Sequence, residues 1–350
     1  VYADYFSPDN QDNGVKFWNS LIGASKRRPV FQECRTSCRI RMIQENLDGY
    51  HIYLWRNPWD QWWSYKVASY FDVTSQLIIN APFSPSAVQA LRLALGFEGY
   101  IGADLAAAFN YYGSRPLTTN QSYLIFYMLW CLGLREGMRY ADLLLNIDQL
   151  SNSKFYRKMI LSEMCHAGIN GINFSDCRVP QGYYFEEDQN FFESLEDVVH
   201  QWLLSSGWQA DDLERLQDLR HEHQPISWSS IFSNNDDGVK KMGEQASRAR
   251  SIAMRFEDDC AKTANQLVLT SSKLELAEAR LNQAEERATQ AENRATQAET
   301  REAEARDQVQ QALALMEQAQ GLAQQVEARF NQAEERATQA ENRATQAETR

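Results

Sequence analysis

The pattern of apolar and polar residues near position 50 predicts a strand followed by a helix. Residues 50–55 are a short run rich in aromatic and β-branched side chains after Asp48 and Gly49, which is typical of a buried strand in a mostly parallel sheet. Asn57 is a favourable N-cap, and Pro58 suits the first helical position because it has no N–H to leave unpaired. Asp60 follows in the position of a capping-box partner. We therefore predict a helix that begins at Pro58.

The same patterning predicts further elements up to residue 224. Two more strands are expected at 29–34 and 143–147, and helices at 15–22, 86–95, 103–108, 118–138, 154–167, 191–204 and 211–221. The longest apolar run, 123–134, is shorter than the roughly 18 residues of a membrane span, so we expect a buried helix there and no membrane span. Residues 225–243 are rich in turn-forming residues and are predicted to be a linker.

The C-terminal part has a different pattern. From Ala246 onward, apolar residues recur at spacings of three and four, which predicts one long heptad-repeat helix over 244–350. Residues 278–301 recur as 327–350 with differences only at Leu281 and Phe330, so the copies start 49 positions apart. This offset is a whole number of heptads and keeps equivalent residues on the same face of the helix.

Charges beside this seam predict how two such helices would pair. With Ala284 at position d and Ala288 at position a, a parallel in-register pair joins g arginines to e glutamates. The pairs are Arg280 with Glu285, Arg287 with Glu292, Arg294 with Glu299, Arg329 with Glu334, Arg336 with Glu341 and Arg343 with Glu348. An antiparallel pair would place arginine against arginine, so we expect parallel self-association. Alanine buries little apolar surface and Glu302 lies at an a position, so a solitary helix acting as a spacer is the alternative.

Composition narrows the functional classes. The formal net charge of −12 argues against a general nucleic-acid-binding protein, because no basic stripe offsets it. The six cysteines are scattered rather than arranged in a disulfide framework, which favours a reducing compartment. We therefore expect a cytoplasmic protein.

Arg56 lies where the predicted strand meets the predicted helix. A helix N-terminus presents free N–H groups and positive dipole charge to an anion, and the arginine fork matches a phosphate. Ser64, about two turns along the helix, could add a hydroxyl donor. The alternative, weighted equally, is that Arg56 pairs with Asp60 on the surface while Ser64 faces solvent.

The motif Arg56-Asn57-Pro58-x-Asp60-x-x-x-Ser64 after a strand resembles the 3′-phosphate-binding motif of sulfotransferases that use PAPS (3′-phosphoadenosine 5′-phosphosulfate). The resemblance implies that Arg56 and Ser64 hold the 3′-phosphate. It also implies an α/β fold for residues 1–224, with a P-loop-like parallel sheet flanked by helices. The implied reaction is sulfuryl transfer from PAPS to an acceptor hydroxyl, with carbohydrates among the candidate acceptors, and it needs no metal.

Softer similarities extend the resemblance from about residue 29 to about residue 181. Residues 140–150 are similar to the family's later strand and its acidic corner, and Arg178 lies where a basic segment closes over the 3′-phosphate. Glu33 is the candidate general base that would take the acceptor proton. The equally weighted alternative is that Glu33 pairs with the surrounding arginines.

One expected part of the family pattern is missing. The family begins with a Pro-x-x-Gly-Thr-Thr loop that grips the 5′-phosphosulfate, and this chain contains no such loop. The expectation is therefore an N-terminally truncated bacterial-type sulfotransferase, inactive as this fragment. The rival is a non-catalytic oligomerisation or tethering protein built on a degenerate α/β domain. A nucleotide-dependent kinase is disfavoured because no Gly-Lys-Ser/Thr motif is present.

Overall fold

The computed structural model describes residues 2, 4–6, 11–182, 184–225 and 237–348. It divides into two units, Val1–Thr270 and Ser271–Arg350. Most of the predicted linker, 226–236, lies outside the described residues, and helix α13 begins at Asp237.

Two short parallel strands form the sheet of the first unit. Strand β1 (Ile52–Trp55) pairs with β2 (Leu143–Asn146), with Ile52 opposite Leu143 and Trp55 opposite Asn146. These strands confirm the positions predicted near 50–55 and 143–147, but β1 is not buried throughout, because Leu54 is 51% exposed. Parallel neighbours must be joined by a crossover connection, and here the crossover is a long helical segment.

The predicted fold class was wrong. The chain is mostly helical, at 73%, and the described residues contain this two-stranded sheet but no P-loop-like sheet. The strand expected at 29–34 is absent: these residues have no regular structure, and Val30 is 91% exposed. Only Val30 and Phe31 are strongly apolar there, so the segment has too little apolar surface to be held in a sheet.

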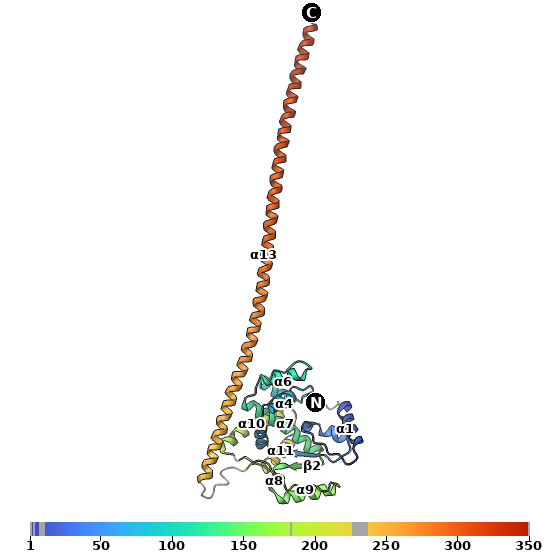
Figure 1. Cartoon of the computed structure of the whole chain (residues 1–350), viewed down its shortest axis with the longest axis vertical. Coiled ribbons are helices and arrows are strands. Elements are labelled where there is room, and N and C mark those ends of the chain that lie inside the picture. Colours follow the sequence, from blue (N-terminus) through green and yellow to red (C-terminus); the bar gives the residue numbers. More distant parts are fainter. Residues whose placement is uncertain (1, 3, 7–10, 183, 226–236, 349–350) are drawn as a thin grey trace. The chain divides into compact units, whose positions relative to one another are not determined.

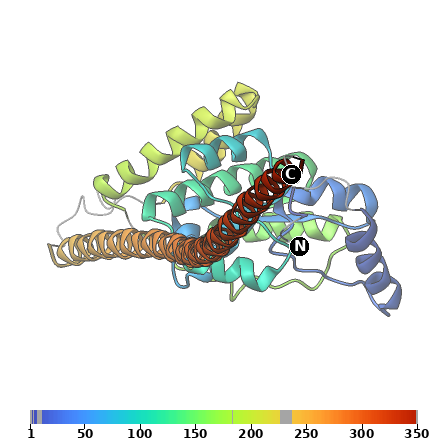
Figure 2. The ribbon, with the colours of Figure 1, turned by 90° about the horizontal axis from the view of Figure 1, so that it is seen from above.

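The other regular elements described in the first unit are helices (Figures 1 and 2). They are α1 (Gln11–Ala24), α2 (Ile40–Asn46), α3 (Pro58–Tyr65), α4 (Tyr70–Ile79), α5 (Ser86–Ala94), α6 (Leu105–Gly113), α7 (Thr119–Tyr140), α8 (Ile147–Asn152), α9 (Lys154–His166), α10 (Glu186–Ser205) and α11 (Ala210–Glu222), with a 3-10 turn η1 (Ser37–Arg39). The eight helices predicted before residue 224, including the one that begins at Pro58, are therefore present, with ends shifted by a few residues.

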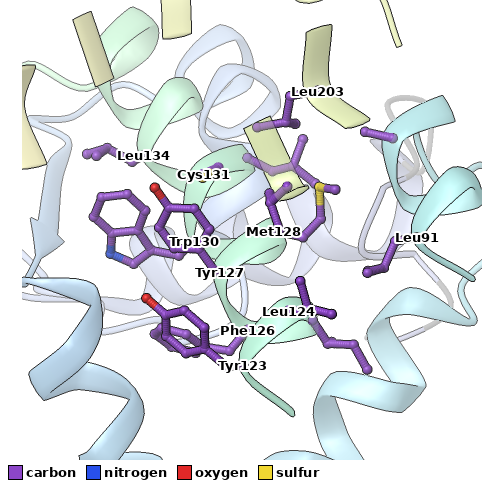
Figure 3. Packing of buried hydrophobic residues seen from close by; sticks show 14 of the residues in the cluster. Leu91, Tyr123, Leu124, Phe126, Tyr127, Met128, Trp130, Cys131, Leu134 and Leu203 are labelled. Carbon is purple, nitrogen blue, oxygen red and sulfur yellow. The ribbon is translucent and has the colours of Figure 1, made fainter. Parts of the chain in front are cut away.

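Helix α7 is the centre of the core. Thr118 and Gln121 form a capping box at its start, and nearly every side chain from Ser122 to Leu134 is buried. Figure 3 shows its aromatic side chains on one side and Leu124 and Met128 on another, near Leu91 of α5. The apolar run at 123–134 is thus a buried helix, as predicted. No helix among the described residues is both long and apolar enough to cross a bilayer.

A buried ion pair joins α10 to α11. Arg220 Nη2 lies 2.6 Å from Glu196 Oε2, and both side chains are 3% exposed. Glu196 Oε1 also accepts hydrogen bonds from Trp59 Nε1 of α3 at 2.7 Å and from the Tyr123 hydroxyl of α7 at 2.6 Å. Burial raises the pKa of Glu196, although Arg220 acts against this shift. One carboxylate therefore links four helices.

Helix α13 (Asp237–Glu348) confirms that the C-terminal part is one long helix. Its segment within the first unit packs against the globular residues, where Ser247 Oγ donates to Asp188 Oδ2 at 3.1 Å and Asp258 Oδ1 accepts from the backbone of Thr119 at 2.6 Å. In the second unit, the described side chains are exposed.

Candidate functional site

The junction between β1 and α3 has the predicted helix start. Asn57 Oδ1 accepts a hydrogen bond from the backbone N–H of Trp59 at 2.8 Å, and Pro58 occupies the first turn. The predicted capping box is not formed, because the Asn57 N–H donates to Asp148 Oδ2 at 3.0 Å rather than to Asp60. The cap is therefore completed by a residue distant in sequence.

Arg56 is held at the carboxyl end of β1. Its Nε donates to Asp148 Oδ1 at 2.8 Å, and its Nη2 donates to the carbonyl oxygen of Pro180. The Arg56 carbonyl accepts from Trp130 Nε1 of α7 at 3.0 Å. The Arg56 side chain is only 11% exposed, so its guanidinium is fixed in position before any ligand binds.

Asp60 is a second carboxylate beside Arg56. Its Oδ2 lies 3.9 Å from Arg56 Nη2, while its Oδ1 accepts from the Gly182 N–H at 2.8 Å and from the Tyr184 hydroxyl at 2.6 Å. Burial raises the pKa of Asp60, and these hydrogen bonds and Arg56 partly oppose the rise. Arg56 thus does pair with Asp60, but inside the protein and less closely than with Asp148.

A cavity of about 180 Å³ lies beside this ion pair. It is lined by Asn57, Asp60, Asp148, Gln149, Asn152, Gln181, Gly182, Glu222, His223, Gln224 and Pro225. Burial lowers the pKa of His223, which favours its neutral form. Small-molecule sites usually measure roughly 300 to 1,000 Å³, so this cavity has room for a phosphate-sized group but not for a whole nucleotide.

Arg56 itself is not among the residues that line this cavity, whose carboxylates are those of Asp60, Asp148 and Glu222. The other predicted site residues lie outside the cavity as well. Ser64 is exposed, and its hydroxyl donates to the backbone carbonyl of Gln61 at 2.6 Å. Arg178 is also exposed, with Nη1 donating to the carbonyls of Ser175 and Cys177 at 3.0 and 2.8 Å. Glu33 is exposed in the irregular segment before η1. Among the described residues, no hydrogen bond or ion pair joins Ser64, Arg178 or Glu33 to Arg56.

Sequence reasoning missed Asp148 as the direct partner of Arg56. A usable signal existed, because the carboxyl ends of parallel strands meet at one edge of a sheet, and Asp148 closely follows β2 as Arg56 follows β1. The contact from Pro180 gave no comparable signal, since it comes from a segment without regular structure.

Within residues 2, 4–6, 11–182, 184–225 and 237–348, no cluster of three or more His, Cys, Asp or Glu residues is arranged to hold a metal ion. Comparisons with protein-family models, curated proteins and solved structures found no match to this chain.

Proposed function

We propose that the chain is part of a PAPS-dependent sulfotransferase in which Arg56 binds the 3′-phosphate of the donor. The observation that carries this proposal is the position of Arg56 between the carboxyl end of a parallel strand and the capped N-terminus of α3. Ligands of open parallel sheets bind outside the carboxyl ends of the strands, and a helix N-terminus favours anions there. The phosphate-sized cavity adjoins this position through Asn57 and Asp148, although Arg56 does not line it.

The hydrogen bonds of Arg56 determine how a phosphate would bind. Asp148 occupies Nε and Pro180 occupies Nη2, whereas Nη1 has no hydrogen-bond partner among the described residues. A phosphate that binds Nη1 and Nη2 together must replace the neutral carbonyl of Pro180, but it can leave Asp148 in place. Because a charged oxygen makes a stronger hydrogen bond to a guanidinium than a carbonyl does, this exchange favours the phosphate.

The proposed reaction forms a bond between the acceptor oxygen and sulfur as the bond from sulfur to the donor's 5′-phosphate oxygen breaks. The acceptor hydroxyl loses its proton to a base, for which Glu33 is the candidate, and 3′-phosphoadenosine 5′-phosphate (PAP) leaves. We place this reaction in the cytoplasm, because all six cysteines are free thiols.

Calorimetry with PAP tests the proposal. Arg56→Ala should weaken PAP binding at least about tenfold, and Ser64→Ala should weaken it if that hydroxyl also reaches the phosphate. Arg41→Ala is the matched control, since the Arg41 side chain is 49% exposed and its Nε lies 3.8 Å from Glu45 Oε1 on the same helix. The double variant Arg56→Gln with Asp148→Asn removes both charges of the buried pair, so neither is left without its partner. If this variant folds but does not bind PAP, the loss of binding reflects the missing guanidinium and not a loss of folding.

The rival function is that of a tether without catalysis. The observation in its favour is that Asp148 and Asp60 already neutralise Arg56, which is how a structural arginine is satisfied. A tether predicts no PAP binding by the wild-type chain, whereas the sulfotransferase proposal predicts binding that depends on Arg56.

A further inference from the structure

The segment of α13 in the first unit uses one face to contact the globular residues. Ser247, Arg250 and Ala261 lie on this face, with Arg250 Nη2 at 2.7 Å from Asp188 Oδ2 and Ala261 only 1% exposed. In the heptad numbering that places Ala288 at a, these residues occupy positions b and e. The docked face is therefore not the a/d seam.

The a/d seam of the same segment is exposed. Phe256 at d is 69% exposed, Leu267 at a is 66% exposed, and Cys260 at a is exposed. Docking of the globular residues thus leaves the apolar seam uncovered.

The seam is also uncovered in the second unit. The larger apolar residues at the a and d positions of this register are more than half exposed: Leu274 59%, Leu281 59%, Val309 59%, Met316 54%, Val326 66% and Phe330 67%. Four further leucines of this unit are also more than half exposed and lie outside a and d: Leu276 at c, Leu313 at e, and Leu315 and Leu322 at g. A solitary helix would leave this stripe in water, and most helical stability in proteins comes from packing such a face.

We infer that a second copy of this chain covers the seam of residues 274–347, in parallel and in register. The charges beside the seam identify the occupant. Lys273 and Arg280 at g meet Glu278 and Glu285 at e of the partner, and both copies of the repeated segment continue this pattern. In an antiparallel pair, g would face g and e would face e, so like charges would be opposed throughout these segments.

Because the repeated segments are nearly identical, one shifted register can compete with the in-register pairing. A shift of 49 residues would pair 278–301 of one chain with 327–350 of the other and would keep the same charge pairs. The in-register arrangement has the longer overlap, and it packs Val309, Met316 and Phe330 against the same residues of the partner. Because buried apolar area drives association, the in-register arrangement is favoured.

The segment around Glu302 weakens the pairing locally. Glu302 lies at a, and Arg301 at g would face Arg306 at e of the partner. Within one chain, Arg306 Nη2 already donates to Glu302 Oε1 at 2.7 Å. This pairing reduces the charge at the seam, and the flanking heptads determine the alignment.

Disulfide cross-linking of the full chain tests the register. In a background with Cys34, Cys165 and Cys260 replaced by serine, Ala288→Cys and Ala337→Cys place thiols at equivalent a positions of the two repeats. Glu286→Cys places a thiol at f, on the outer face, as the control. All three positions are exposed in the single chain, so none of the substitutions disturbs packing within it.

The expected result under mild oxidation is a covalent dimer of the Ala288→Cys chain and of the Ala337→Cys chain, with several-fold less from Glu286→Cys. A mixture of the first two should give no link between positions 288 and 337. Equal cross-linking at 286 and 288, or a link between 288 and 337, would overturn the inference. This result is independent of whether PAP binds at Arg56.

Discussion

Asp148 joins the ends of the two parallel strands through Arg56. Oδ1 of Asp148 accepts from Arg56 Nε at 2.8 Å, and Oδ2 accepts from the next backbone N–H at 3.0 Å. Both side chains are about one-tenth exposed, at 11% and 10%. One carboxylate therefore fixes the strand end, the helix cap and the guanidinium together.

Replacing Asp148 by asparagine should destabilise the protein. The change leaves Arg56 with only the more distant Asp60 as a charged partner, and loss of one partner of a buried pair costs roughly 3 kcal/mol. Urea denaturation should show this decrease in the free energy of unfolding. Asp259→Asn, at a pair that is more than two-thirds exposed, is the control and should change it by less than about 1 kcal/mol. Equal effects of the two substitutions would show that the Asp148 pair contributes no more than a surface pair.

The ion pair of Glu196 and Arg220 predicts a non-additive pair of substitutions. Arg220→Met alone leaves a buried carboxylate without its cation and should cost roughly 3 to 5 kcal/mol. Adding Glu196→Gln removes the remaining charge, and the Gln side-chain oxygen can still accept from Trp59 and Tyr123. The double variant should therefore be more stable than Arg220→Met in the same denaturation experiment. A double variant that is less stable would contradict this account of the cluster.

His200 predicts a loss of stability in acid. Burial lowers its pKa from 6.5 to about 4, and its ring nitrogens contact the Tyr127 hydroxyl at 2.9 Å and Gln217 Nε2 at 3.1 Å. Between these two pH values the unfolded chain binds a proton that the folded chain does not. The free energy of unfolding should therefore fall as pH decreases from about 6.5 to about 4, by up to about 3 kcal/mol from this residue.

His200→Gln isolates this contribution from those of other groups. The difference in unfolding free energy between wild type and variant should change with pH across that window and level off below about pH 4. A difference that is constant from neutral pH to about pH 4 would show that His200 does not titrate differently in the two states.

Glu302 predicts a substitution that strengthens self-association. Glu302→Leu replaces a carboxylate at an a position by an apolar side chain and should tighten association at least about tenfold, measured by sedimentation equilibrium. Glu304→Leu makes the same change at a c position, outside the seam, and serves as the control. If both substitutions tighten association equally, general hydrophobicity rather than the seam is responsible.

Helices that are specified by neighbouring residues were predicted correctly from the sequence. Asn57 and Pro58 specify the start of α3, and the unbroken apolar run at 123–134 specifies a buried helix. The P-loop-like sheet followed from a resemblance rather than from local signals and was wrong, because the described residues contain a two-stranded parallel sheet and no P-loop-like sheet. At 29–34, β-propensity without enough apolar surface to bury was not sufficient to form a strand.

The candidate site was predictable only in part. The position of Arg56 between a strand and a helix follows from the residues next to it in the sequence. Its hydrogen-bond partners, Asp148 and Pro180, lie 92 and 124 positions further along the chain. Such contacts depend on which segments pack together, and spacing in the sequence does not encode them. Ser64 illustrates the same point, because its hydroxyl satisfies a nearby carbonyl instead of reaching the arginine.

The most direct test of the central claim compares the affinities of PAP and adenosine 5′-monophosphate, which differ only in the 3′-phosphate. If Arg56 binds that phosphate, the wild-type chain should prefer PAP by at least about tenfold, because a charged hydrogen bond contributes roughly 1.5 to 3 kcal/mol. Arg56→Ala should remove the preference, and Arg41→Ala should retain it. Equal affinities in the wild type, or a preference that survives in a folded Arg56→Ala variant, would contradict the proposal.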